Sequence, residues 1–213
     1  MAGDNEPRIG NLPREQWTDE ARDVFAFWGN PGARENGVKV NTSMVFAQHP
    51  KLAVAYYTFG KQVLLESTFP VRPRELVVLR MAWLMKSEYE WHYHVGYALA
   101  AGLTLEEIAA IRDGAESPVW QGKDQDRAVL TATDELLAQN TITAPTWEAL
   151  SAFLDTHQLM DLVFTAGNYV VMTWAINAFG IPLESHVDRI GFDLKTRSGE
   201  PPAGSNRPSG KAS

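Results

Sequence analysis

Ionisable side chains lie in an otherwise apolar helical pattern between Arg72 and Gly114. Glu90 and His94 are separated by one helical turn, so their side chains can meet on one face. Ser87 belongs to the same face, but at about 1.5 Å rise per residue it lies roughly 10 Å from His94 along the axis, too far for a direct nucleophile and base pair. Glu90 lies between them. A carboxyl group beside an imidazole is suited to proton transfer.

The pair of Glu90 and His94 has a simpler interpretation as an exposed helix pair with only local stabilising value. Aromatic residues flank the pair in the sequence and favour partial burial, so we interpret both residues as catalytic candidates. Burial raises the pKa of a carboxyl group and a neighbouring imidazolium lowers it, and the sequence does not decide which effect is larger. His92 lies about 160° around the helix from Glu90, so whether it joins the site stays open.

Other residues of this stretch are candidates for substrate binding. Arg80 is suited either to a substrate carboxylate or to a structural ion pair, and the sequence does not separate the two. Ser87 is a candidate contact, although a helix cap is the favoured interpretation. Trp91 is a candidate pocket wall, with core packing as the default. Glu75 lies near a helix N-terminus, where an acid is stabilised by the helix dipole.

The same residues offer oxygen and nitrogen ligands for a metal, but the known patterns are absent. The sequence contains no His-Glu-x-x-His motif, no paired Glu-x-x-His motif and no cysteine. It also contains no glycine-rich phosphate loop and no dinucleotide fingerprint. We therefore predict a site that uses neither metal nor cofactor and binds a small-molecule substrate.

Composition limits the class of protein. The chain has 213 residues, 45% of them hydrophobic, and a formal charge of -7 with a pI near 5.2, which disfavours nucleic-acid binding. The N-terminal residues lack the features of a secretion signal, so we predict a cytoplasmic protein. Polar residues, among them Asp161 and Asn168, interrupt the apolar stretch from Leu159 to Ile181, so a buried helix is favoured over a membrane span.

Capping and breaking residues predict a helical chain around these candidates. Thr104 and Glu107 form a capping-box pattern, Pro50 and Pro73 suit first turns, and Gly102 suits a C-terminal cap. Loops are expected at residues 30–37 and 115–123, and a flexible tail at 196–213. The predicted helices span residues 18–29, 50–67, 73–84, 87–101, 104–113, 124–139, 146–154 and 157–179.

Several segments resemble the carboxymuconolactone decarboxylase and alkylhydroperoxidase-D-like family. The resemblance is carried by E-L-V-V-L-R, S-E-Y-E-W-H-Y-H and A-G-L-T-L-E-E-I-A-A-I, and more weakly by later helices. It implies an all-α helical bundle at residues 50–183, an N-terminal extension at 1–49 with a short helix, and a C-terminal extension at 184–213. It also implies a homotrimer or an oligomer built from trimers.

In the peroxidase branch of that family, a glutamate precedes a Cys-x-x-Cys pair and a histidine. Glu75 matches the glutamate and His94 the histidine, while Ser87 and Glu90 occupy the cysteine positions. Without thiols the peroxidase mechanism does not carry over. The resemblance implies acid and base chemistry by Glu75, Glu90 and His94 on a small organic acid, lactone or carbonyl compound, by decarboxylation or another lyase or isomerase reaction. The alternatives are a non-thiol oxidoreductase and a non-catalytic binding or assembly protein.

Overall fold

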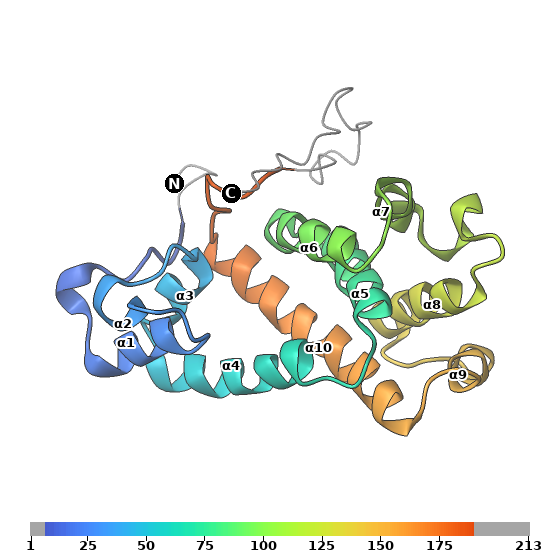
Figure 1. Cartoon of the computed structure of the whole chain (residues 1–213), viewed down its shortest axis with the longest axis horizontal. Helices are drawn as coiled ribbons and strands as arrows, with labels where there is room; N and C mark the ends of the chain where they lie inside the picture. The colour runs from blue at the N-terminus through green and yellow to red at the C-terminus, as the bar shows by residue number, and fades with distance from the viewer. Residues whose placement is uncertain (1–6, 190–213) are drawn as a thin grey trace.

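The computed structural model describes residues 7–189, and every regular element in that range is helical (Figure 1). The all-α prediction is therefore confirmed for this part of the chain. The elements are α1 (Asp19–Ala26), α2 (Ala33–Asn36), α3 (Asn41–Phe46), α4 (Pro50–Leu65), α5 (Val71–Leu84), α6 (Glu88–Ala100), α7 (Leu105–Ala110), α8 (Asp124–Gln139), α9 (Ala144–Ser151) and α10 (Thr156–Phe179), with 3-10 turns η1 (Arg14–Gln16), η2 (Ile111–Glu116) and η3 (Pro118–Trp120).

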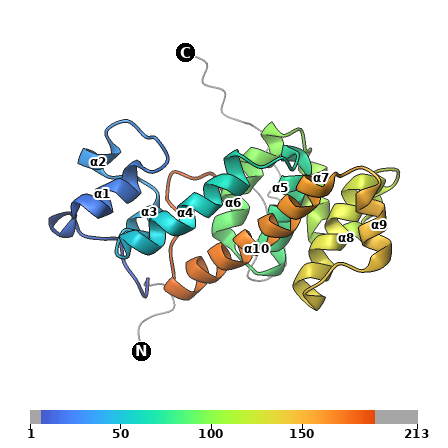
Figure 2. The same cartoon turned by 90° about the horizontal axis from the view of Figure 1, so that it is seen from below.

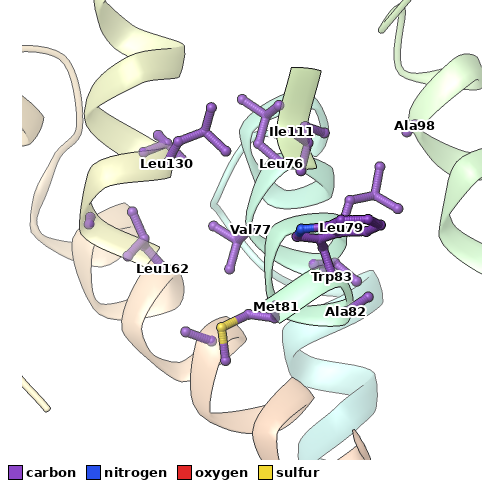
Figure 3. Close-up of a cluster of buried hydrophobic side chains, with 14 of the residues drawn as sticks. Leu76, Val77, Leu79, Met81, Ala82, Trp83, Ala98, Ile111, Leu130 and Leu162 are labelled. Carbon is purple, nitrogen blue, oxygen red and sulfur yellow. The ribbon is translucent and has the colours of Figure 1, made fainter. Parts of the chain in front are cut away.

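The central helix of the larger hydrophobic core is α5, in which every residue from Glu75 to Trp83 is buried. Figure 3 shows α5 with Leu130 of α8 and Leu162 of α10 on one side and Ala98 of α6 on the other. A helix that is buried on all sides carries no polar face. Any ionisable residue in it is therefore taken into the core, where it needs a partner. Glu75 and Arg80 are two such residues.

The N-terminal helices enclose a second, smaller core beside the first. Phe25 of α1 and Tyr57 of α4 belong to this cluster. In Figure 1 the N-terminal helices lie at one end of the molecule and α8 and α9 at the other, while Figure 2 shows α4 and α10 side by side between them. A contact between the two helices is the hydrogen bond from the Tyr56 hydroxyl to the Asn168 carbonyl, at 3.2 Å.

Most of the predicted helix boundaries have the expected physical cause. Thr104 and Glu107 form the capping box of α7, and Thr18 caps α1 by accepting from the Ala21 amide. Lys86 adopts a left-handed conformation, with φ of 57°, where the chain breaks between α5 and α6. Gly102 has φ of 88° directly after α6, a conformation that glycine adopts without strain.

Two predicted loops contain short helices instead. Residues 30–37 include α2, and α3 follows before α4. Residues 115–123 contain part of η2 and all of η3. Helices this short show too few turns for a hydrophobic period to be visible in the sequence. The tail predicted at residues 196–213 lies outside the described residues.

Helix α10 is the longest helix of the described residues, and it packs against α4, α5, α8 and α9. By length and composition it is apolar enough to cross a membrane, with a mean hydropathy of 1.3 over an 18-residue window of which 44% is buried. Core helices of globular proteins meet the same criterion. Here Leu159, Leu162 and Ala166 belong to the larger core, whereas Phe164 and Trp174 are 51% and 64% exposed. The buried-helix interpretation therefore holds for one side of α10 only.

Candidate active site

A buried carboxylate and imidazole pair joins α5 to α6. His94 Nδ1 lies 2.7 Å from Glu75 Oε2. Glu75 is completely buried and His94 is only 5% exposed. The other carboxylate oxygen, Oε1, lies 3.3 Å from the Arg74 guanidinium. Glu75 is thus held from both sides and fixes the orientation of the His94 ring.

The second ring nitrogen of His94 faces a tyrosine and a second carboxyl group. His94 Nε2 lies 3.0 Å from the Tyr169 hydroxyl and 3.5 Å from Glu90 Oε2. The structure therefore brings Glu75, Glu90 and His94 together around one imidazole. The short hydrogen bond that orients the His94 ring is made with Glu75 and not with Glu90.

Burial dominates the electrostatics of this cluster. Burial raises the pKa of Glu90 above the ordinary carboxyl value, although His94 lowers it, and the neighbouring Glu75 carboxylate raises it further. Burial also raises the pKa of the Tyr169 hydroxyl well above its ordinary value, and Glu90 and Glu75 add to the shift. The neutral forms of Glu90 and Tyr169 are both favoured by these effects.

The partners of His94 select one tautomer of the neutral ring. A protonated Tyr169 hydroxyl can donate to Nε2, which leaves the ring proton on Nδ1 to be donated to the Glu75 carboxylate. This arrangement satisfies both nitrogens at once. Glu90 then stands beside Nε2 with a carboxyl group suited to give or take a proton.

A cavity of about 250 Å³ adjoins the cluster, and Glu90 and His94 are part of its wall. All six tyrosines of the chain line this cavity. Its wall is built from the segment before α4 and from α4, α6 and α10. The lining residues are Trp28, Asn30, Val38, Val40, Thr42, Ser43, Tyr56, Tyr57, Gly60, Leu64, Tyr89, Glu90, Tyr93, His94, Tyr97, Asn168, Tyr169 and Met172.

The N-terminal extension forms one side of the cavity. Trp28 follows α1, Val38 and Val40 precede α3, and Thr42 and Ser43 lie within it. Residues 30–37, which the sequence predicts as a loop, contribute Asn30 to the cavity wall.

Glu184 joins two tyrosines of this wall to the start of α3. Its carboxylate accepts hydrogen bonds from the hydroxyls of Tyr89 and Tyr93, at 2.7 and 2.9 Å. It also accepts from the Asn41 amide at the start of α3, at 2.5 Å. The chain after α10 thereby ties α6 to the N-terminal segment. Nothing in the local sequence around Glu184 indicated this role, because it depends entirely on tertiary contacts.

None of the three residues predicted to bind substrate lines the cavity. Arg80 is held by Asp134, with Nε 2.6 Å from Oδ1, and it donates to the Ile111 and Arg112 carbonyls. Of the two interpretations of Arg80, the structure therefore shows the structural ion pair. Ser87 caps α6 by accepting from the Glu90 amide at 3.3 Å.

Trp91 belongs to the larger hydrophobic core, with its ring 5.8 Å from that of Trp83. Trp91 therefore packs in the core, which was the default interpretation from the sequence. His92 is buried but is not part of the cavity wall. Within residues 7–189, no group of three or more histidine and acidic side chains is arranged to hold a metal.

Sequence reasoning missed Tyr169 and Asn168, although a signal was present. Both lie in the middle of the most apolar stretch of the chain, where polar side chains are costly unless they have a role. Asn168 was noted only as an interruption of a membrane-like pattern. A polar pair at the centre of a buried helix is the kind of feature that points to a site.

Comparisons with known proteins agree with this arrangement. The model of the carboxymuconolactone decarboxylase family matches residues 50–135, which include Glu75, Glu90 and His94. No curated protein matches the chain at a significant level.

Solved structures share the fold at low sequence identity. An uncharacterised peroxidase-related protein from Silicibacter sp. is 16% identical, with a TM-score of 0.68 over 88% of this chain and 97% of that one. The debrominase Bmp8, in complex with 2,3,4-tribromopyrrole, is 13% identical, with a TM-score of 0.65 over 83% and 91%. A protein of unknown function from Agrobacterium tumefaciens, described as a candidate AhpD antioxidant defence protein, is 18% identical, with a TM-score of 0.60 over 70% and 99%.

The matched residues, the helical architecture and the position of Glu75 and His94 all lead to the same assignment. Residues 50–135 match the model of the carboxymuconolactone decarboxylase family, the chain shares its fold with AhpD-like structures, and Ser87 and Glu90 stand at the positions that the resemblance assigns to the two cysteines of the peroxidase branch.

Proposed function

We propose that the cavity is the active site of an enzyme of the lyase or isomerase class, which moves protons on a small lactone or carbonyl compound without a cofactor. The observation that carries this proposal is the position of His94, with Nδ1 bound to Glu75 at 2.7 Å and Nε2 facing Glu90 at 3.5 Å in the cavity wall. A base held in one tautomer beside an acid with a raised pKa is an arrangement for proton transfer.

In the proposed reaction His94 and Glu90 have complementary roles. When the substrate binds, the Tyr169 hydroxyl releases His94 Nε2. This nitrogen then accepts a proton from a carbon next to the substrate carbonyl, and the electron pair of the broken C–H bond passes into an enol. The neutral Glu90 carboxyl group donates its proton to the carbonyl oxygen or to a distant carbon. Glu75 stays a carboxylate and stabilises the imidazolium that forms. Transfer of the extra proton from His94 back to Glu90, directly or through the substrate, restores both residues. An isomerisation therefore needs no further reactant.

Decarboxylation loses its main support in this geometry. Arg80, the cation expected to hold a substrate carboxylate, is bound to Asp134. No lysine or arginine of the described residues takes its place in the cavity wall. The debrominase neighbour, crystallised with a small flat ring compound, supports the idea that this fold surrounds such ligands.

Isomerisation of 3-cyclohexen-1-one to its conjugated isomer in D₂O tests the proposal, because NMR follows both the new double bond and the incorporated deuterium. Binding of the ketone is established first by ligand-observed NMR. We expect turnover to fall roughly 100-fold or more in His94→Ala and in Glu90→Gln. His157→Ala, an exposed histidine in the first turn of α10, is the matched control.

Two results separate the alternatives. If the ketone binds but is neither isomerised nor deuterated, the non-catalytic binding protein is favoured. If peroxide is consumed by the metal-free protein in the presence of a dithiol, the non-thiol oxidoreductase is favoured.

A further inference from the structure

The aromatic wall of the cavity offers ring surfaces more than free hydroxyl groups. Tyr56 donates to the Asn168 carbonyl, Tyr57 shares a hydrogen bond with Ser43, and Tyr169 contacts His94. The hydroxyls of Tyr89 and Tyr93 are bound to Glu184. Because these polar ends already have partners, a ligand meets mainly the rings, together with Trp28. Flat rings pack well against such a wall.

The charges around the cavity favour an uncharged ligand. The described part of the wall contains no lysine or arginine, so an anion would lose its hydration without gaining a cationic partner. The guanidinium of Arg74, beside the buried Glu75, is bound to that carboxylate and to the Leu64 carbonyl. A cation would find no free carboxylate either, because Glu75 is already paired with Arg74 and His94, and burial favours the neutral form of Glu90.

One buried polar atom of the wall forms no hydrogen bond. Asn168 is 5% exposed, and its side-chain oxygen Oδ1 forms no hydrogen bond. Asn168 lies on α10 opposite Gly60 of α4. A Cβ atom added at Gly60 would lie 3.9 Å from Asn168 Oδ1. A buried amide oxygen without a donor costs free energy that a ligand N–H or O–H group can recover.

We propose that the cavity binds a small, uncharged ring compound that donates a hydrogen bond from an N–H or O–H group to Asn168. The inference rests on the proposed function, since it names the substrate class of the same site. A cavity of about 250 Å³ is suited to one small ring with its substituents.

Four probes of similar size separate the contributions of ring, donor and charge. Phenol is uncharged at neutral pH, since a phenolic pKa is about 10. Toluene lacks the donor, benzoate is an anion and benzylammonium is a cation. Dissociation constants are measured by ligand-observed NMR on the full chain. We expect phenol to bind most tightly, and about 10-fold or more better than toluene, as expected for one satisfied buried acceptor.

Asn168→Leu tests the position of the acceptor. It should weaken phenol binding about 10-fold and leave toluene binding unchanged or improved. Asn177→Leu, on the same helix but exposed and outside the cavity, is the matched control. If Asn168→Leu does not fold, as judged by circular dichroism, the comparison of phenol with toluene on the unaltered protein still decides whether a donor is recognised.

Tighter binding of benzoate or benzylammonium than of phenol would overturn the inference, as would equal binding of phenol and toluene or no binding of any probe at millimolar concentration. Its failure is distinguishable from failure of the proposed function. Selective phenol binding without turnover of any neutral ketone rejects the function alone. Turnover that depends on His94, together with a preference for benzoate, rejects this inference alone.

Discussion

The Tyr89 hydroxyl donates a hydrogen bond of 2.7 Å to Glu184 Oε1, although the two residues are 95 positions apart in the chain. The same carboxylate binds Tyr93 and the Asn41 amide. A single acid after α10 therefore fixes two tyrosines of the cavity wall and the start of α3. Its removal leaves these donors without an acceptor.

We expect Glu184→Ala to lower the free energy of unfolding by about 1–3 kcal/mol, the cost of leaving buried donors unsatisfied. Glu184→Gln keeps one acceptor oxygen and should lose less. Urea unfolding followed by circular dichroism measures both variants. Equal stability of Glu184→Ala and the unaltered protein would show that the contact contributes nothing. Ligand affinity should fall with stability in the alanine variant, because the wall loses its fixed tyrosines.

The contrast between Glu184 and Thr104 shows what the sequence can predict. The Thr104 capping box acts within four neighbouring residues, so the helix start was predictable. The family resemblance likewise located Glu75, Glu90 and His94 before their geometry was known. Glu184, Tyr169 and the wall residues of the N-terminal segment depend on contacts between distant parts of the chain. The role of Arg80 was not decidable, because its partner Asp134 lies on another helix.

The raised pKa of Glu90 makes a prediction about stability and pH. The folded protein keeps the Glu90 proton at pH values where the unfolded chain has already released it. The stability gained from the neutral carboxyl group is therefore complete below pH 4.5, the ordinary pKa of a glutamate. It is lost as the pH rises through the pKa of Glu90 in the folded protein. Glu90→Gln has no proton to lose. We therefore expect its stability relative to the unaltered protein to increase as the pH rises above 4.5.

Urea unfolding of both proteins across this pH range provides the measurement. The titratable groups that interact with Glu90 are His94, Glu75, Tyr169 and Tyr56. They remain in both proteins, so the difference between the two curves reports mainly on Glu90. Glu106→Gln, an exposed glutamate on α7, is the control and should show no such trend. A difference that does not change with pH would mean that Glu90 is not forced toward its neutral form.

Substitution of glycine by alanine is expected to change stability in opposite directions at Gly60 and Gly114. Gly60 lies within α4 in a helical conformation, and an added Cβ would meet only Asn168 Oδ1, at an unstrained 3.9 Å. Gly60→Ala should therefore stabilise the protein by about 0.5–1 kcal/mol, the helix preference of alanine over glycine. Gly114 has φ of 73°, and a Cβ there would stand 2.7 Å from Arg80 Nη2. Gly114→Ala should destabilise the protein by more than about 1 kcal/mol.

Thermal and urea unfolding of this pair give a direct comparison with the same added methyl group. A loss of stability in Gly60→Ala would show that the space between α4 and α10 is tighter than the structure has it. A neutral result for Gly114→Ala would show that the ion pair of Arg80 with Asp134 can move without cost.

The outer surfaces of α4 and α10 make a prediction about assembly. Phe59 and Phe164 have rings 6.1 Å apart and are 38% and 51% exposed, so the apolar side chains of the two helices form a continuous face. Trp174 extends this face with 64% of its surface exposed. Exposed apolar patches of this kind favour association. We therefore expect a homotrimer or an oligomer built from trimers, as the family resemblance implies.

Light scattering at micromolar concentration measures the mass, and a monomer there would reject the prediction. Trp174→Glu places a charge on the apolar face and should shift the protein toward smaller species, because burying an unpaired carboxylate in an interface is costly. Leu105→Glu, at an exposed apolar residue of α7 away from this face, should leave the mass unchanged (Figure 1). If Leu105→Glu dissociates the oligomer and Trp174→Glu does not, the subunits meet through another surface, and the α4 and α10 face needs a different explanation.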